Sequence, residues 1–213
     1  MRVLYFHGFA SSPASAKITA LRPILERHGI ELVTPDLNVP SFETLDWEAL
    51  IRLGISRFDD THPSAIVGSS LGALLALEVV NRGRHAPLVL IAPALGVARR
   101  WRERMPEGDP ISVFNFARNA NVPIHRAFFD QITNVTVDLE PPPVRVTVIM
   151  GRKDETVPFA VVEETWQSWM SAGLVAGSEF IELAEGDHSL TSEAGLIATQ
   201  IRRAIANAPA SSS

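Results

Sequence analysis

The strongest chemical signal in the sequence is a pentapeptide of small residues, Gly68-Ser69-Ser70-Leu71-Gly72. It follows the apolar run 64–67 directly and precedes a segment that is apolar almost all round. A serine on a tight turn between a strand and a helix exposes its hydroxyl, and the flanking glycines leave room for that turn. This setting predicts that Ser70 is a nucleophile. The weaker alternative is a turn that serves only helix packing.

A serine hydroxyl needs a base to take its proton and a further group to orient that base. His188 follows the apolar run 179–183, and Asp154 follows the apolar run 144–149. Both residues are therefore expected at the carboxyl ends of strands, where sites form in parallel sheets. We predict that His188 is the base and Asp154 the acid. Glu155 is the rival acid, and Asp154 would then only hold a turn.

Acyl transfer to a serine also needs N–H groups that stabilise the developing oxyanion. The amide of Leu71, directly after the nucleophile, can supply one of them. The loop after the first apolar run begins with His7-Gly8, and we expect the Phe9 amide to supply the other, with Ala10 as the alternative. A plain turn at the end of a strand is the competing interpretation of His7-Gly8.

Short apolar runs alternate with helix-like segments along the chain, which predicts an α/β fold with a mainly parallel sheet of about six strands. The expected strands are 3–6, 31–34, 64–67, 87–91, 144–149 and 179–183. The expected helices are a segment from Ser12 to Gly29 and the segments 46–58, 71–82, 159–172 and 193–206. Pro23 removes a backbone donor inside the first helix, so a kink or break is expected near residue 22.

The long interval 94–143 interrupts this alternation and predicts an inserted helical cap. Its aromatic residues could line an apolar pocket or pack the cap onto the core: Trp101, Phe114, Phe116, Phe128 and Phe129. Four arginines could meet an anionic substrate, although glutamates beside them favour a solvated helix face. These arginines are Arg99, Arg100, Arg102 and Arg104.

The length, charge and composition of the chain are those of an ordinary globular protein. The 213 residues fit a single domain, 1–213, with a loose tail at 207–213. A net charge of −5 argues against nucleic acid as a partner, and no run of 18 apolar residues indicates a membrane span. A soluble, cytoplasmic protein is expected. With no cysteine and no zinc-type spacing, no metal or cofactor is expected, and a surface loop explains the acidic cluster at 59–62.

Three segments together give the chain a family resemblance. They are Phe6-His7-Gly8-Phe9 with the serines and lysine of 11–17, Val67 to Gly72, and Gly186-Asp187-His188-Ser189. In these segments the sequence resembles the small bacterial YqiA-like esterases of the α/β-hydrolase superfamily, and it departs from them in the polar region 99–109.

That resemblance implies an α/β-hydrolase fold and hydrolysis of carboxylic esters, through Ser70, Asp154 and His188, without a cofactor. The expected partner is a small-molecule acyl ester. The alternatives are an acyl-thioesterase, or a hydrolase fold without catalysis that binds a small ligand or a partner. The sequence predicts neither the acyl chain length nor the oligomeric state.

Overall fold

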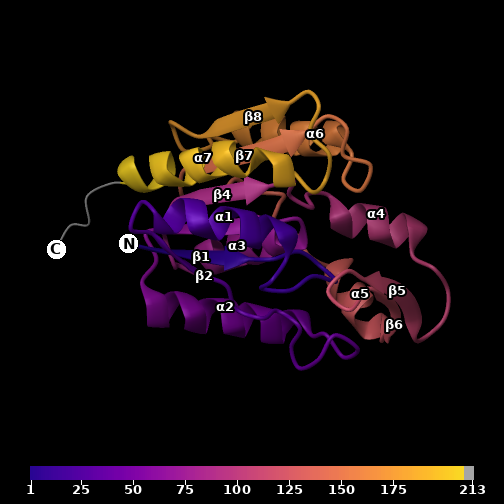
Figure 1. The fold of residues 1–213 in the computed structure, drawn as a ribbon. Helices are drawn as coiled ribbons and strands as arrows, with labels where there is room; N and C mark the ends of the chain where they lie inside the picture. The colour runs from indigo at the N-terminus through magenta and orange to yellow at the C-terminus, as the bar shows by residue number, and fades with distance from the viewer. Residues whose placement is uncertain (209–213) are drawn as a thin grey trace.

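The computed structural model of the chain describes residues 1–208, which form a parallel sheet, helices on both of its faces and a cap (Figure 1). The main sheet has six strands in the order β2-β1-β3-β4-β7-β8, and all neighbouring strands run parallel. The strands are β1 (Arg2–Phe6), β2 (Glu31–Val33), β3 (Ala65–Ser69), β4 (Leu88–Ile91), β7 (Val146–Gly151) and β8 (Glu179–Leu183). The predicted α/β class and six-stranded sheet are confirmed.

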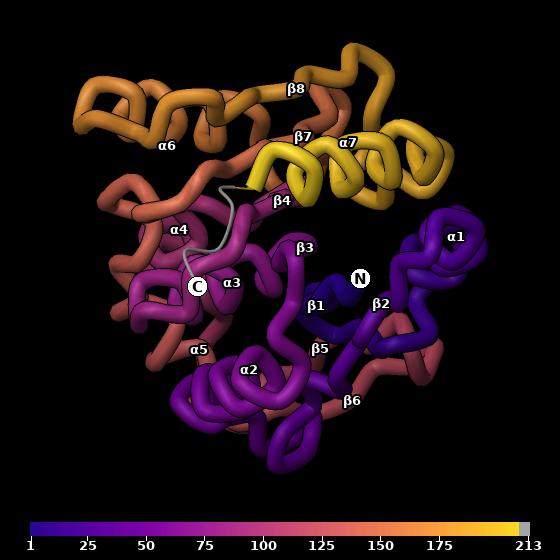
Figure 2. The backbone as a smooth tube through the Cα atoms, turned by 90° about the vertical axis from the view of Figure 1, so that its left-hand side faces the viewer, coloured from indigo at the N-terminus to yellow at the C-terminus, as the bar shows by residue number. Residues whose placement is uncertain are grey.

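Two layers of helices enclose the sheet, as the view along it shows (Figure 2). On one face lie α1 (Ala16–Glu26) and α7 (Ala194–Ala206), which pack against each other. On the other face lie α2 (Trp47–Thr61), α3 (Leu71–Asn81) and α6 (Phe159–Ser171). Because α3 is sandwiched between the sheet and α2, nearly every one of its side chains is buried, which explains its apolar sequence.

The first helix differs from its prediction in where it begins and in its path through Pro23. It begins at Ala16 rather than at Ser12, because residues 12–15 form a turn in which the Ser15 amide donates to the Ser12 carbonyl. It also runs without a break through Pro23. Burial of the side chains on both sides of the proline holds the segment in one helix: Ile18, Leu21 and Leu25.

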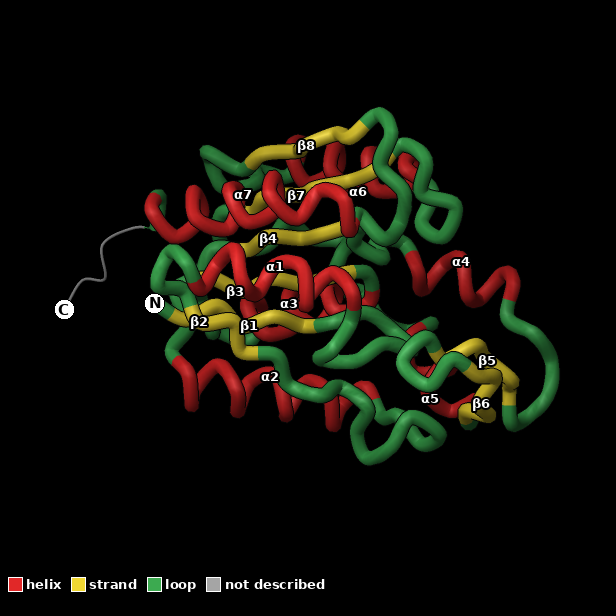
Figure 3. The backbone as a smooth tube through the Cα atoms, in the orientation of Figure 1, coloured by secondary structure: helices red, strands yellow, loops and turns green. Residues whose placement is uncertain are grey.

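The inserted segment is not wholly helical, which corrects the predicted helical cap. Between α4 (Val97–Arg104) and α5 (Arg126–Ile132) lies an antiparallel hairpin of β5 (Ile111–Asn115) and β6 (Ala120–Ile124). This hairpin lies at one end of the molecule, beyond the carboxyl ends of the parallel strands (Figure 3). Alternating burial along β5 shows why the segment pairs as strands: Ile111 and Asn115 face inward, whereas Ser112 and Phe114 are exposed.

The acidic cluster 59–62, expected as a surface loop, forms the exposed last turn and the cap of α2. His62 ends this helix with a positive φ of 44°. The amides of Asn207 and Ala208 donate to the carbonyls of Arg203 and Ile205 at the end of α7, and the rest of the expected tail, 209–213, lies outside the described residues. Among residues 1–208, no helix is long and apolar enough to cross a membrane.

Candidate active site

Ser70 occupies the sharp turn between β3 and α3. Its φ of 53° and ψ of −121° are strained for a residue with a Cβ, and backbone bonds on both sides hold them. The Ser70 amide donates to the Ile91 carbonyl at 3.0 Å, and the Ala94 amide donates to the Ser70 carbonyl at 3.1 Å. A Cβ at Gly72 would overlap the Phe6 carbonyl oxygen, so the turn is this tight only with glycine there.

His188 and Asp154 come to this serine from two loops that are packed together. The Lys153 amide donates to the Gly186 carbonyl at 2.9 Å, and a Cβ at Gly151 would overlap the same carbonyl. His188 Nε2 lies 3.2 Å from Ser70 Oγ, and His188 Nδ1 lies 2.7 Å from Asp154 Oδ2. The structure thus brings the three predicted residues into one hydrogen-bonded series.

The Asp154 carboxylate is closed off from solvent and fully engaged. Its other oxygen, Oδ1, accepts hydrogen bonds from the amides of Thr156 and Val157, each at 2.8 Å. The Asp154 side chain is 0% exposed, whereas the side chain of His188 is 29% exposed. A carboxylate held in this way orients the imidazole with Nδ1 as donor and leaves Nε2 free to accept a proton. Glu155, the rival acid, is exposed and makes no such contact with His188.

Phe9 and Leu71 both lie near Ser70, Leu71 next to it in the sequence and Phe9 in the loop after β1. A Cβ at Gly8 would lie 3.1 Å from Ser70 Cβ, so the loop after β1 passes directly beside the serine. Within residues 1–208, neither the Phe9 N–H nor the Leu71 N–H has a hydrogen-bond acceptor. Two unoccupied donors beside a serine hydroxyl suit an oxyanion. The N–H of Ala10, the alternative donor, likewise has no hydrogen-bond acceptor within residues 1–208, and the Ala10 carbonyl accepts a hydrogen bond from the Phe116 amide of the cap.

His7 shapes this loop and is more than a strand-ending residue. It is buried, and its Nε2 accepts a hydrogen bond from the Leu37 amide at 3.1 Å. Nδ1 therefore carries the proton and donates to the Gly8 carbonyl at 2.9 Å. Burial lowers the pKa of His7, which keeps the ring neutral in this arrangement.

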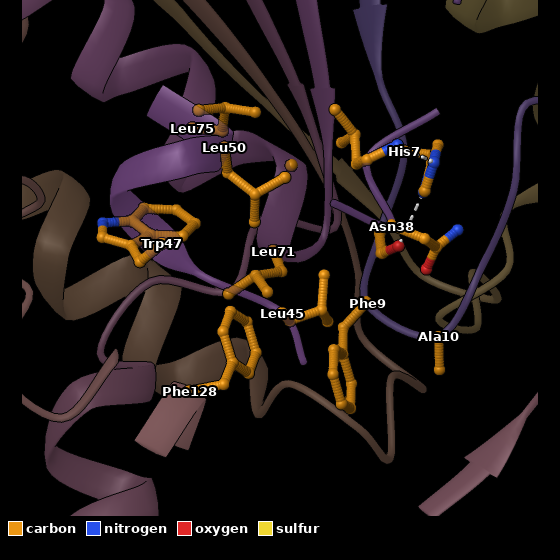
Figure 4. Close-up of a pocket in the computed structure, with 13 residues that line it drawn as sticks. His7, Phe9, Ala10, Asn38, Leu45, Trp47, Leu50, Leu71, Leu75 and Phe128 are labelled. Atoms are coloured by element: carbon orange, nitrogen blue, oxygen red, sulfur yellow. Dashed lines mark hydrogen bonds between the residues drawn. The ribbon is translucent and has the colours of Figure 1, made fainter. Parts of the chain in front are cut away.

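Behind the loop, a small cavity of about 20 Å³ is lined by Phe9, Leu71, Phe128 and other residues (Figure 4).

Ser70 and His188 open into a cavity of about 660 Å³ with two chemically different sides. The apolar side includes Leu71, Val97 and Trp101. The polar side consists of hydroxyl-bearing and charged side chains from the start of α1, the end of β3 and the His188 loop. They are Ser11, Ser15, Lys17, Ser69, Asp187, Ser189 and Thr191, and the lining also includes Arg100 of α4 and Lys153, Glu155 and Thr156 of the loop after β7.

The cap aromatics divide between packing and the cavity. Phe128 and Phe129 are buried and pack on the ring of Phe9, with centroids 5.7 and 5.9 Å away. Trp101 lies 5.8 Å from the same ring and also lines the cavity. Phe116 lines the cavity too, although it is 74% exposed. The cap thus presses on the loop that carries the Phe9 amide.

Only one of the four cap arginines reaches the cavity. Arg100 lines it and donates to the Thr156 carbonyl at 2.5 Å. Arg99 lies 3.5 Å from Glu164 of α6, and Arg102 donates to the Thr133 carbonyl. These arginines therefore attach α4 to its neighbours, and only Arg100 is placed where a substrate could meet it.

Sequence reasoning missed Lys17 as a residue of this site. Its ammonium donates to Ser69 Oγ at 2.9 Å, next to the nucleophile, and the side chain is 9% exposed. Two signals were available: Lys17 belongs to the segment 11–17 that carries the family resemblance, and it stands beside Ile18 in the predicted first helix.

The model of the family described as "Uncharacterised protein family (UPF0227)" matches residues 2–194. Mouse alpha/beta hydrolase domain-containing protein 10 superposes with a TM-score of 0.75 at 19% identity, over 96% of this chain and 89% of that one. Est1E from Butyrivibrio proteoclasticus, with ferulic acid bound, gives 0.74 at 15% identity, over 97% and 90% of the two chains. The esterase domain of a Rhodothermus marinus protein gives 0.71 at 16% identity, over 96% and 87%.

At these identities the structural matches establish the fold, and the family match covers most of the sequence. The predicted resemblance to the YqiA-like α/β-hydrolases is confirmed at this level. The chain belongs to the UPF0227 family and has the α/β-hydrolase fold.

Proposed function

We propose that this protein is a serine hydrolase that cleaves carboxylic esters through an acyl-enzyme intermediate. The observation that carries the proposal is the hydrogen-bonded series from Ser70 Oγ through His188 to the buried carboxylate of Asp154. A structural role alone does not require a strained serine with its hydroxyl directed at an imidazole. Of the solved structures with the same fold, two are named as an esterase domain and as Est1E.

In the acylation step, Ser70 Oγ attacks the acyl carbon while His188 Nε2 takes the hydroxyl proton. The carbonyl oxygen becomes an oxyanion, which the N–H groups of Phe9 and Leu71 stabilise. When the tetrahedral intermediate collapses, the bond to the alcohol oxygen breaks and His188 gives its proton to that oxygen. The alcohol leaves, and Ser70 carries the acyl group.

Water completes the cycle by the same route. His188 removes a proton from water as the water oxygen attacks the acyl carbon, and it returns the proton to Ser70 Oγ as the acid leaves. Throughout both steps, Asp154 stabilises the imidazolium without itself taking the proton. The reaction needs no group beyond these side chains, the two amides and water.

The test is hydrolysis of p-nitrophenyl esters from acetyl to dodecanoyl, with acyl thioesters measured beside them. Turnover that disappears in Ser70→Ala supports the proposal, and the preferred acyl length reports the depth of the apolar side. A fluorophosphonate should form an adduct on Ser70 of the wild-type protein. Equal rates for wild type and Ser70→Ala on every substrate, with no adduct, would refute the proposal and favour a binding role.

A further inference from the structure

Lys17 is a buried cation in the wall of the catalytic cavity. It belongs to the first turn of α1 and lines the same cavity as Ser70 and His188. An ammonium has three N–H donors, and within residues 1–208 only one has an acceptor, Ser69 Oγ. The other two donors have no partner among the described residues.

No carboxylate neutralises this charge by direct contact. Among the described residues, no Asp or Glu oxygen lies within 4.0 Å of Lys17 Nζ. The two nearest acids, Asp154 and Asp187, act on it only over a longer distance. Both are already engaged: Asp154 with His188 and two amides, and Asp187 with the Ser189 hydroxyl and the Leu190 amide.

Keeping a lysine in this state costs stability, because burial removes water from the ammonium. That burial lowers the pKa of Lys17 to about 8, so the group is still mostly charged at neutral pH. Lys153, which also lines the cavity, is by contrast exposed and paired with Glu185. Of these two lysines, only Lys17 is buried and lacks a carboxylate in direct contact.

The surroundings of Lys17 suit an anion more than a neutral group. Ser15 and Ala16 line the cavity beside it, and they form the start of α1, where the helix dipole is positive. Hydroxyls from Ser11, Ser189 and Thr191 complete this side of the cavity. Another part of the lining, from α4, offers apolar contact at Val97 and Trp101, and Arg100 adds a cation there that donates to the Thr156 carbonyl.

We propose that Lys17 binds a free carboxylate of the substrate, so that the preferred substrates are esters that carry such a carboxylate, with their hydrocarbon part on the apolar side. This inference rests on the proposed function for the reaction itself and adds the class of substrate. The carboxylate oxygens would take the two unused N–H donors of the ammonium. Half-esters of short dicarboxylic acids satisfy this description when the carboxylate is on the acyl side.

The competing explanation for the buried lysine is structural: its hydrogen bond to Ser69 holds the nucleophile turn in place. It leaves two donors of a buried ammonium without a function. A neutral side chain could satisfy the Ser69 hydroxyl without the cost of burying a charge. The experiment must therefore separate an effect on binding of charge from an effect on the position of Ser70.

The kinetic experiment compares pairs of esters that differ in charge. For the acyl side, the pair is mono-4-nitrophenyl glutarate and its methyl ester, with spontaneous hydrolysis subtracted. For the alcohol side, the pair is carboxymethyl butanoate and ethyl butanoate, followed by acid release. Lys17→Met removes the ammonium with little change of shape, and Lys153→Met is the matched control for loss of one positive charge at the same cavity.

We expect wild type to prefer the anionic member of at least one pair by about 10- to 100-fold in kcat/KM, mainly through KM. Lys17→Met should lose this preference, because kcat/KM falls more for the anionic esters than for the neutral ones, and Lys153→Met should keep the preference. Labelling of Ser70 by a neutral fluorophosphonate should slow less in Lys17→Met than turnover of the anionic esters does. The absence of any charge preference in wild type would overturn the inference.

Parallel losses in Lys17→Met would also overturn it. If neutral esters, anionic esters and fluorophosphonate labelling all slow by the same factor, Lys17 only positions the nucleophile turn. A binding measurement keeps the inference separate from the proposed reaction: Ser70→Ala is titrated with methyl hydrogen glutarate and with dimethyl glutarate. Tighter binding of the acid, lost in Ser70→Ala/Lys17→Met, supports the anion site even if no ester is hydrolysed, and equal binding refutes it.

Discussion

Lys17→Met also changes stability, and the size and pH dependence of that change can be worked out from the structure. Burial lowers the pKa of Lys17 from the ordinary value of 10.5 to about 8. This difference corresponds to about 3 kcal/mol by which the fold disfavours the ammonium. The groups that face the ammonium are the Ser69 hydroxyl, with the buried Tyr5 phenol beyond it, and the more distant carboxylates of Asp154 and Asp187.

Methionine removes this cost but also removes the hydrogen bond to Ser69, which is worth roughly 1 kcal/mol. At pH 7 the variant should therefore be more stable than wild type by about 2 kcal/mol. The pH dependence of this difference follows from proton binding. Below pH 8 the lysine is charged in both the folded and the unfolded chain, so wild type carries the full cost of burying the ammonium. As the pH rises from 8 towards 10.5, the folded protein holds fewer protons on this group than the unfolded chain, and wild type gains stability.

The assay is urea unfolding of both proteins at pH 7 and pH 10, with free energies of unfolding compared at equal m-values. Titration of other groups, including Tyr5, affects both proteins alike and cancels in the difference. The advantage of the variant should shrink by about 2 kcal/mol between the two pH values. An advantage that does not change with pH, or a variant that is less stable at pH 7, would refute the view that Lys17 is a buried charge held at a cost.

Three further predictions concern the site. Asp154→Asn should lower kcat on p-nitrophenyl butyrate by up to about 10⁴-fold, because the amide no longer holds His188 in the required tautomer; normal turnover would move the acid role to Glu155. Gly72→Ala should destabilise the protein by about 1–3 kcal/mol in urea unfolding, because its Cβ overlaps the Phe6 carbonyl; an unchanged midpoint would contradict the tight turn. Trp101→Ala should raise KM for octanoyl more than for acetyl p-nitrophenyl ester, and equal effects would show that Trp101 only packs the cap.

The sequence predicts the sheet and the nucleophile turn because both depend on local patterns. A buried parallel strand must be a short apolar run, and Gly72 must be glycine wherever the turn passes against β1. Strand direction places Asp154 and His188 near each other, because the carboxyl ends of parallel strands all lie at one edge of the sheet. Periodicity alone could not place the hairpin of the cap, because β5 and β6 have only 5 residues each, are largely exposed, and pair with each other instead of with the main sheet.

Lys17 could not be predicted as a site residue for a different reason. A lysine in an amphipathic helix is usually solvated, and its burial depends on where α1 lies relative to β3 and the His188 loop. The contact between Lys17 and Ser69 joins residues 52 positions apart, and no spacing rule links them. The predicted helix start at Ser12 would also have moved Lys17 from the first turn of the helix into its second.

The two costly features of this fold lie side by side, and this proximity is itself an argument about function. Ser70 holds a backbone conformation that disfavours any residue with a Cβ, and Lys17 holds an ammonium away from water against the hydroxyl of the preceding residue, Ser69. Other residues with a Cβ, such as Ala92 and Leu190, also have positive φ, but among residues 1–208 Lys17 is the only buried lysine or arginine. Neither cost improves the packing of the core, since a glycine and a methionine at these positions would relieve them. Both features face one cavity beside one imidazole, so a single bound molecule that uses the serine and the ammonium together accounts for both.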